Sequence, residues 1–115
     1  MVTKINSLSK NNDFISILKG KKITNKYATI FFKKLNLKKN NNNLNVSFIT
    51  KKKLGNAVFR NKIKRRLRNI MIEALKKINL NYEYSYLFIA KKNIFHDDYR
   101  LIKENIFKDL KKIKK

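Results

Sequence analysis

The chain has 115 residues, a length that suits one domain, and 43% of its residues are hydrophobic, enough to build a core rather than a disordered segment. It carries 30 Lys and Arg against seven Asp and Glu, which gives a formal net charge of +23. The absence of cysteine excludes disulfides and thiolate metal sites, and the single histidine, His96, excludes histidine metal clusters and catalytic triads.

The N-terminal segment, residues 1–10, is predicted to be a mobile basic tail. A short helix should follow, capped by Asn12 or Asp13 and ending at Gly20. Its apolar residues fall at i, i+3 and i+4 and therefore share one face: Phe14, Ile17 and Leu18.

Two β-rich segments come next. The aromatic stretch Tyr27–Leu35 predicts a strand, the asparagine-rich stretch Lys38–Asn43 a hairpin loop, and the alternating stretch Leu44–Thr50 the partner strand. Alternation places Tyr27, Thr29 and Phe31 on one face of the first strand. The sequence leaves open which face meets a helix.

A basic loop, Lys51–Gly55, leads into a long helix predicted over about Asn56–Ile78. An apolar stripe at helical spacing predicts its buried face: Phe59, Ile63, Leu67, Ile70, Met71, Ala74 and Ile78.

The nearly all-apolar segment Ser85–Ala90 predicts a strand covered on both faces. Asp97 should cap a last helix that buries Tyr99, Ile102, Ile106, Leu110 and Ile113. This order predicts a two-layer α+β domain.

The stretch Lys51–Arg68 holds nine cations in eighteen residues and no acid. At 100° per residue, Asn61, Lys64, Arg65 and Arg68 share one flank of the long helix, while Lys62 and Arg66 lie on the other. Such a cluster repels itself, so it favours a polyanionic partner such as RNA. The alternative is a solvated, lysine-rich surface, but such surfaces usually mix charges of both signs.

The sequence contains no recognisable set of catalytic residues. The acids are scattered, His96 has no evident partner, and there is no Gly-rich phosphate loop. The amides of Gly55 and Asn56 could bind a phosphate at the start of the long helix. With eight Phe and five Tyr, one or two aromatic rings could stack on single-stranded bases, although each could equally belong to the core.

The segment G-N-A-V-F-R-N-K-I-K-R-R-L-R at Gly55–Arg68 resembles the signature of the protein subunit of bacterial ribonuclease P. Arg60-Asn61-Lys62 matches an Arg-Asn-Arg element with lysine at its third position, and a Lys-Arg pair and a further Arg follow it. The three lysines Lys51–Lys53 are one more than the family segment usually holds. The likeness extends over about residues 8–112, through Asp13-Phe14 with Ile17 and through Leu87–Lys92.

The resemblance implies an α-β-β-β-α-β-α fold with a left-handed β-α-β crossover around the long basic helix. It implies that the RNA subunit with Mg²⁺, and not the protein, cleaves precursor tRNA to form the mature 5′ end. The implied RNA-subunit contacts are Lys51, Lys52, Lys53, Asn56, Arg60, Asn61, Lys62, Lys64, Arg65 and Arg68. The implied leader groove lies between the long helix and the sheet, with three candidates for its wall: Phe14, Leu18 and Phe31.

Two other functions stay open from the residues. A ribosomal or ribosome-assembly protein would share the size and charge, and only the Arg60–Arg68 motif separates it from the first interpretation. A self-sufficient ribonuclease would need an acid–base pair that the sequence does not offer. No apolar run reaches about 18 residues and no signal-peptide core is present, so we expect a cytoplasmic protein without membrane or small-molecule ligands.

Overall fold

The structure, a computed structural model, describes residues 4–6, 11–34, 43–78, 84–95 and 97–113. One five-stranded sheet has the order β1-β4-β5-β3-β2. The strands are β1 (Lys4–Asn6), β2 (Lys21–Thr24), β3 (Ala28–Lys34), β4 (Asn43–Ile49) and β5 (Tyr84–Ala90). The helices are α1 (Asn11–Leu18), α2 (Ala57–Lys77) and α3 (Tyr99–Lys112), with two 3₁₀ turns, η1 (Lys52–Leu54) and η2 (Lys92–Phe95).

From α1 to α3 the order is α-β-β-β-α-β-α, so the predicted fold class is confirmed. β2 pairs antiparallel with β3, and β3 pairs antiparallel with β5. The predicted hairpin between Tyr27–Leu35 and Leu44–Thr50 is therefore wrong, because β5 lies between β3 and β4. β4 and β5 are parallel neighbours that α2 connects, so they form the expected β-α-β unit. The left-handed sense of that unit stays a prediction.

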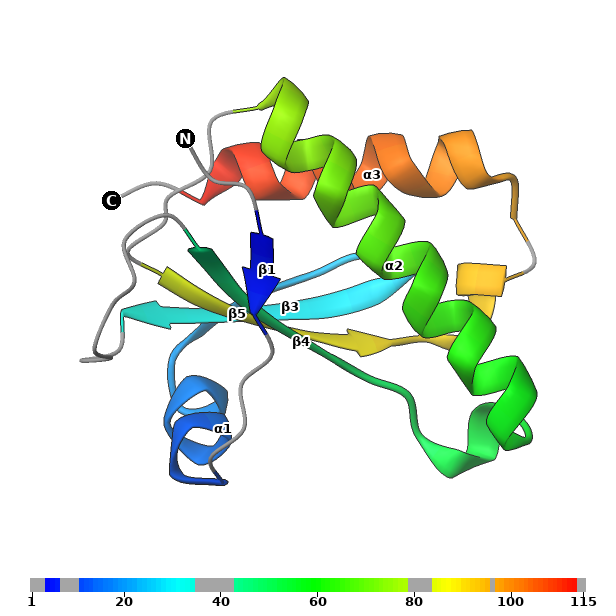
Figure 1. The fold of residues 1–115 in the computed structure, drawn as a ribbon, viewed down its shortest axis with the longest axis horizontal. Coiled ribbons are helices and arrows are strands. Elements are labelled where there is room, and N and C mark those ends of the chain that lie inside the picture. Colours follow the sequence, from blue (N-terminus) through cyan, green and yellow to red (C-terminus); the bar gives the residue numbers. More distant parts are fainter. Residues whose placement is uncertain (1–3, 7–10, 35–42, 79–83, 96, 114–115) are drawn as a thin grey trace.

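Helices cover the sheet unequally. α2 and α3 lie side by side on one face, and the short α1 lies on the other (Figure 1). The main core fills the space between the sheet and α2 with α3. It includes Ile30, Val46 and Phe88 from strands and Ile63, Leu67, Ile70, Ile102 and Ile106 from helices. Every one of these eight side chains is fully buried, which confirms the apolar stripes predicted for both long helices.

A smaller cluster sits under α1, where Ile17 and Leu87 are fully buried and Phe31 and Ile49 pack beside them. Gly20 lets α1 approach the sheet closely. A Cβ at this position would lie 2.9 Å from both the Cβ of Lys33 and the carbonyl oxygen of Phe32. A larger residue there would therefore push α1 away from β3.

The N-terminal prediction differs from the structure. Instead of belonging to a mobile tail, Lys4–Asn6 form β1 and pair in parallel with Asn43–Asn45 of β4. Three residues of alternating polarity are too few to predict a strand from the sequence. They form a strand because they hydrogen-bond to β4 at the edge of the sheet. The rest of the predicted tail lies outside the described residues.

Helix starts agree with the sequence at α2 and differ at α1 and α3. α1 begins at Asn11, so the predicted caps Asn12 and Asp13 lie inside the helix. Asn56 caps α2, and its side-chain oxygen accepts from the Phe59 amide at 2.9 Å. The predicted cap Asp97 is wrong, because Asp98 holds the N-cap position of α3. The Asp97 carboxylate instead accepts from the Tyr27 hydroxyl at 2.6 Å and pairs with Lys26 at 3.1 Å. It thus ties the turn between β2 and β3 to the start of α3.

A second polar link joins α2 to α3. Glu73 of α2 accepts from the Tyr99 hydroxyl at 2.7 Å and from Lys103 at 3.1 Å, and these hydrogen bonds hold its pKa below the usual value. Burial and the bond to Glu73 raise the pKa of Tyr99 to about 12. The bond to Asp97 raises the pKa of Tyr27 to about 12 as well.

These raised tyrosine pKa values predict a loss of stability in alkali. A tyrosine in the unfolded chain titrates near pH 10, so its stabilising bond is fully present below that pH. The contribution then fades as the pH rises through the folded pKa of about 12. We expect Tyr27→Phe to lower the free energy of unfolding at about pH 9 and to have much less effect at about pH 12. Urea titrations followed by circular dichroism measure this, and a pH-independent difference would contradict it.

Candidate nucleic-acid interface

The predicted basic flank of α2, defined as Asn61, Lys64, Arg65 and Arg68, is exposed along its whole length. Among the described residues, no carboxylate pairs with any of its three cations. The side of α2 next to α3 differs, because Glu73 there engages Lys77 and Lys103. A row of exposed cations that no described carboxylate neutralises favours a polyanionic partner over a role in folding.

The other predicted residues of α2 divide into two groups. Arg66 turns toward α3, where its guanidinium lies 5.8 Å from the Tyr99 ring centre and donates to the Asp97 carbonyl at 3.5 Å. Its role is therefore structural. Lys62 is exposed, but helical spacing places it near Arg66 rather than on the basic flank.

The junction between β4 and α2 contains a glycine in an unusual backbone conformation and several cationic side chains. The extended loop residue Gly55 has φ of +150°, a conformation that side chains rarely adopt, and a Cβ there would lie 2.8 Å from the Phe59 ring. Arg60 is half-buried in the first turn, and its Nε makes no hydrogen bond among the described residues. Lys51, Lys52 and Lys53 are all exposed just before this turn.

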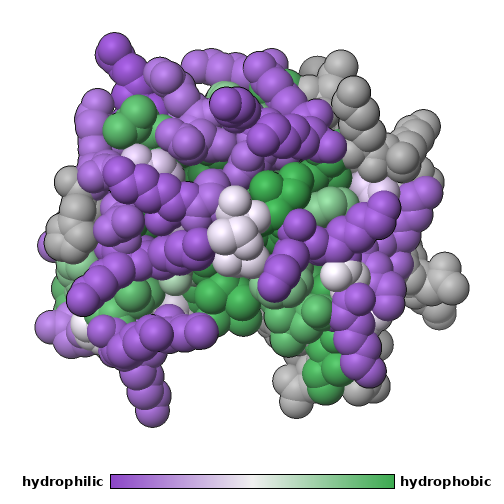
Figure 2. Space-filling model, turned by 180° about the vertical axis from the view of Figure 1, so that it is seen from behind, coloured by the Kyte–Doolittle hydropathy of each residue, from purple (hydrophilic) through white to green (hydrophobic). Residues whose placement is uncertain are grey.

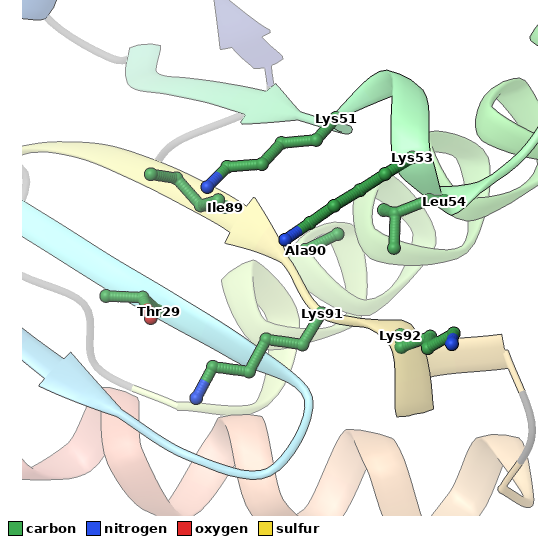
Figure 3. A pocket seen from close by; sticks show the side chains of 8 residues that line it. All are labelled: Thr29, Lys51, Lys53, Leu54, Ile89, Ala90, Lys91 and Lys92. Atoms are coloured by element: carbon green, nitrogen blue, oxygen red, sulfur yellow. The ribbon is translucent and has the colours of Figure 1, made fainter.

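A groove of about 420 Å³ lies on the α1 face of the sheet, where β4 and β5 end. Its floor and walls combine apolar and cationic side chains: Thr29, Lys51, Lys53, Leu54, Ile89, Ala90, Lys91 and Lys92. Lys51 and Lys53 extend over the end of β5, Lys91 extends toward the turn between β2 and β3, and Lys92 points away (Figure 3). Phosphates could meet the lysines while bases lie on the apolar floor.

Of the three predicted groove residues, the structure describes the side chains of Phe31 and Leu18. Phe31 is half-buried on the α1 face, together with Leu87 and Ile49, and not beside α2. Among the described residues, core side chains fill the space between α2 and the sheet, which leaves no groove there for Phe31 to line. Leu18 is 44% exposed at the end of α1. The side chain of Phe14 lies outside the described residues.

The groove and Phe31 belong to one continuous surface. Thr29 and Phe31 are two residues apart in β3, so their side chains lie on the same face of the sheet. In the register of the two strands, Thr29 pairs with Ile89 of β5 and Phe31 pairs with Leu87. Lys22 of β2 lies over the Phe31 ring at 5.8 Å. Seen from behind, much of the molecule is hydrophilic, with apolar surface showing in hollows between the polar side chains (Figure 2). The surface near Phe31 thus offers a half-buried aromatic ring beside the Lys22 ammonium.

A metal centre does not fit these residues. Within the described part of the chain, no group of three His, Asp or Glu side chains converges. The groove is lined by lysines, which repel a divalent cation. None of the helices in the described ranges is long and apolar enough to cross a membrane.

Known proteins match nearly the whole chain. The family model named Ribonuclease P matches residues 2–114. The chain belongs to the ribonuclease P protein family. The ribonuclease P protein component of Fusobacterium nucleatum is 36% identical over 110 residues, and 95% of this chain and 94% of that protein are covered. The component of Streptococcus agalactiae is 30% identical over 105 residues, with 90% of each covered.

Solved structures show the same fold. The ribonuclease P protein of Thermotoga maritima superposes with a TM-score of 0.78 at 24% identity, covering 96% of this chain and 99% of that one. The Staphylococcus aureus protein gives 0.72 at 25% identity, with 92% of each chain covered. Membership of this family makes the chain a subunit of ribonuclease P, an endoribonuclease.

In this ribonuclease P protein, sequence reasoning missed Lys91 and Lys92 as groove residues. Their positions in the sequence offered a clue. Lys91 and Lys92 come just after the end of β5, and Lys51 comes just after the end of β4. The carboxyl ends of parallel neighbouring strands meet at one edge of a sheet. The β-α-β unit that the family resemblance implies therefore brings these two lysines close to Lys51 and Lys53.

Proposed function

We propose that the protein binds ribonuclease P RNA through the basic flank of α2 and the lysines before it. The observation that carries this proposal is the exposed row of Lys64, Arg65 and Arg68, which no described carboxylate neutralises. Arginine suits such contacts because its planar guanidinium binds phosphate with two parallel hydrogen bonds. Lys51–Lys53, Asn56, Arg60, Asn61 and Lys62 would extend the contact around the start of the helix.

The 5′ leader of precursor tRNA would lie on the α1 face of the sheet. Lysines at the groove would meet its phosphates, and Phe31 would stack on one base. η1 connects this groove directly to α2, so one side of the protein could contact both RNAs. This position replaces the groove expected between α2 and the sheet.

The proposed chemistry belongs to the RNA. Magnesium would be held by the RNA subunit and the substrate, because the described protein residues offer no convergent set of ligands. The protein's own residues would bind and orient the two RNAs, raise substrate affinity and neutralise phosphates near the site. Such a role places the protein in the cytoplasm, where precursor tRNA is processed.

The leader groove is tested by removing the Phe31 ring. In the reconstituted holoenzyme, Phe31→Ala should weaken binding of leader-bearing precursor tRNA by about 1–3 kcal/mol, because one base loses its stacking partner. Binding of leaderless tRNA should not change. The measurement is the equilibrium affinity of the holoenzyme for both substrates.

Phe107→Ala provides the matched control, because Phe107 is also half-buried but packs against the main core from α3. It should lower the melting temperature without changing the preference for a leader. Equal weakening of both substrates by Phe31→Ala would place Phe31 in the core and remove it from the groove.

A further inference from the structure

Lys91 differs from the other groove lysines because the protein itself holds its ammonium. Its Nζ donates to the backbone carbonyl of Asn25 at 2.8 Å, and its amide donates to the Tyr27 carbonyl at 2.8 Å. Lys51, Lys53 and Lys92 are exposed, whereas Lys91 is half-buried. An ammonium has three N–H donors, so two remain available to a ligand.

The carbonyl that holds Lys91 belongs to a tightly fixed turn. The side-chain oxygen of Asn25 accepts from the amides of Tyr27 at 2.7 Å and Ala28 at 2.9 Å. The Asn25 amide also donates to the Ala28 carbonyl at 3.0 Å, which closes the connection from β2 to β3. These three hydrogen bonds, two of them made by the Asn25 side chain, hold the turn that carries the Asn25 backbone carbonyl.

Asp109 of α3 holds the Asn25 side chain in this orientation through a hydrogen bond. Its Oδ2 accepts from the Asn25 side-chain nitrogen at 2.7 Å, and the residue is only 6% exposed. An ionised carboxylate can only accept hydrogen bonds, so it holds the nitrogen of Asn25 toward itself and the oxygen toward the turn. Lys112 lies 3.7 Å from the second oxygen, Oδ1.

We propose that Asp109 is a positioning residue for RNA binding: acting through Asn25, it holds the Lys91 ammonium at the groove, where it meets a leader phosphate. This inference rests on the proposed leader groove. A cation that is already ordered loses less freedom on binding than a mobile surface lysine. The hydrogen bonds run from Asp109 to Asn25 and from Asn25 to Lys91. They link α3, which lies on the opposite face of the sheet from α1 (Figure 1), to Lys91 at the end of β5 (Figure 3).

The test is a double-mutant cycle in the reconstituted holoenzyme. Lys91→Met should lower the affinity for leader-bearing precursor tRNA about five- to eightfold at about 0.1 M salt, because one phosphate contact is lost. The affinity for leaderless tRNA should not change. Asp109→Ala should also lower only the leader-bearing affinity, at least about twofold, and should have no further effect when Lys91 is already Met.

Asp109→Asn is the conservative control. Its side-chain oxygen can still accept from Asn25, so the preference for a leader should stay at the level of the unsubstituted protein although the ion pair with Lys112 is lost. A loss of preference in Asp109→Asn equal to that in Asp109→Ala would overturn the inference. So would an Asp109→Ala effect that is the same with and without Lys91, or one that is equal for both substrates.

Side-chain NMR of the free protein tests the same link without a destabilised variant. The Lys91 ammonium should be more restricted in motion than that of the exposed Lys92, in the unsubstituted protein and in Asp109→Asn alike. Equal mobility of the two ammonium groups would overturn the inference. If instead Lys91→Met leaves the leader preference intact while Lys91 is rigid, the proposed groove itself is wrong and the positioning role falls with it.

Discussion

Replacing Leu67 by alanine is expected to lower the free energy of unfolding by about 2–5 kcal/mol, the usual cost of emptying a leucine site in a core. Leu67 is fully buried in the middle of α2, among Ile63, Ile70 and the strands below. A small domain has only about 5–15 kcal/mol of stability in total, and self-repulsion among 30 cations reduces what is available here. The variant should therefore be close to its unfolding transition.

Urea denaturation followed by far-UV circular dichroism measures the effect, with Ile72→Ala as the matched control. Ile72 lies on the same helix but is 37% exposed, so the control should cost less than about 1 kcal/mol. Equal destabilisation by the two variants would mean that α2 does not pack on the sheet through the predicted stripe.

The second large effect is expected from removing three cations of the basic flank together. Lys64→Ala, Arg65→Ala and Arg68→Ala combined should reduce the slope of log affinity against log salt for ribonuclease P RNA by about two to three, because each phosphate contact contributes about 0.7–0.9. At about 0.1 M salt this corresponds to a loss of affinity of roughly 100- to 500-fold. Filter binding over a series of salt concentrations measures both quantities.

An equal change in net charge elsewhere provides the control. Arg100, Lys108 and Lys111 are exposed on α3, and replacing them by alanine also removes three positive charges. Because salt screens charges over about 10 Å, this variant should bind nearly normally at about 0.1 M salt. If both triple variants lose affinity equally, α2 carries no specific interface and its cations are a solvated surface.

The elements with long patterns could be predicted from the sequence. The stripe from Ile63 to Ala74 predicted α2, and its flank of unpaired cations followed from 100° per residue. β3 and β5 were visible as apolar, β-branched or aromatic runs. In contrast, β2 holds only the residues K-K-I-T, which carry no alternation long enough to recognise, and it forms by pairing with the edge of β3.

The candidate site was predicted only in part, for a different reason. Alternation in β3 separated Phe31 from Ile30 and Phe32, but it does not state which face a helix covers. Only packing shows that Ile30 and Phe32 meet α2 and α3, which leaves Phe31 to the α1 face. The sequence favours Asp97 as a helix cap, because its bond to Tyr27, 70 residues away, has no local signature.

Reconstitution at low Mg²⁺ tests the central claim most directly. Precursor tRNA is incubated with ribonuclease P RNA alone, with the protein alone, and with both together, and cleavage at the mature 5′ end is followed over time. We expect no cleavage by the protein alone, little by the RNA alone, and efficient cleavage by the two together, because the protein's cations neutralise phosphates that otherwise demand metal ions. Specific cleavage by the protein alone, or no stimulation of the RNA by the protein, would contradict this account.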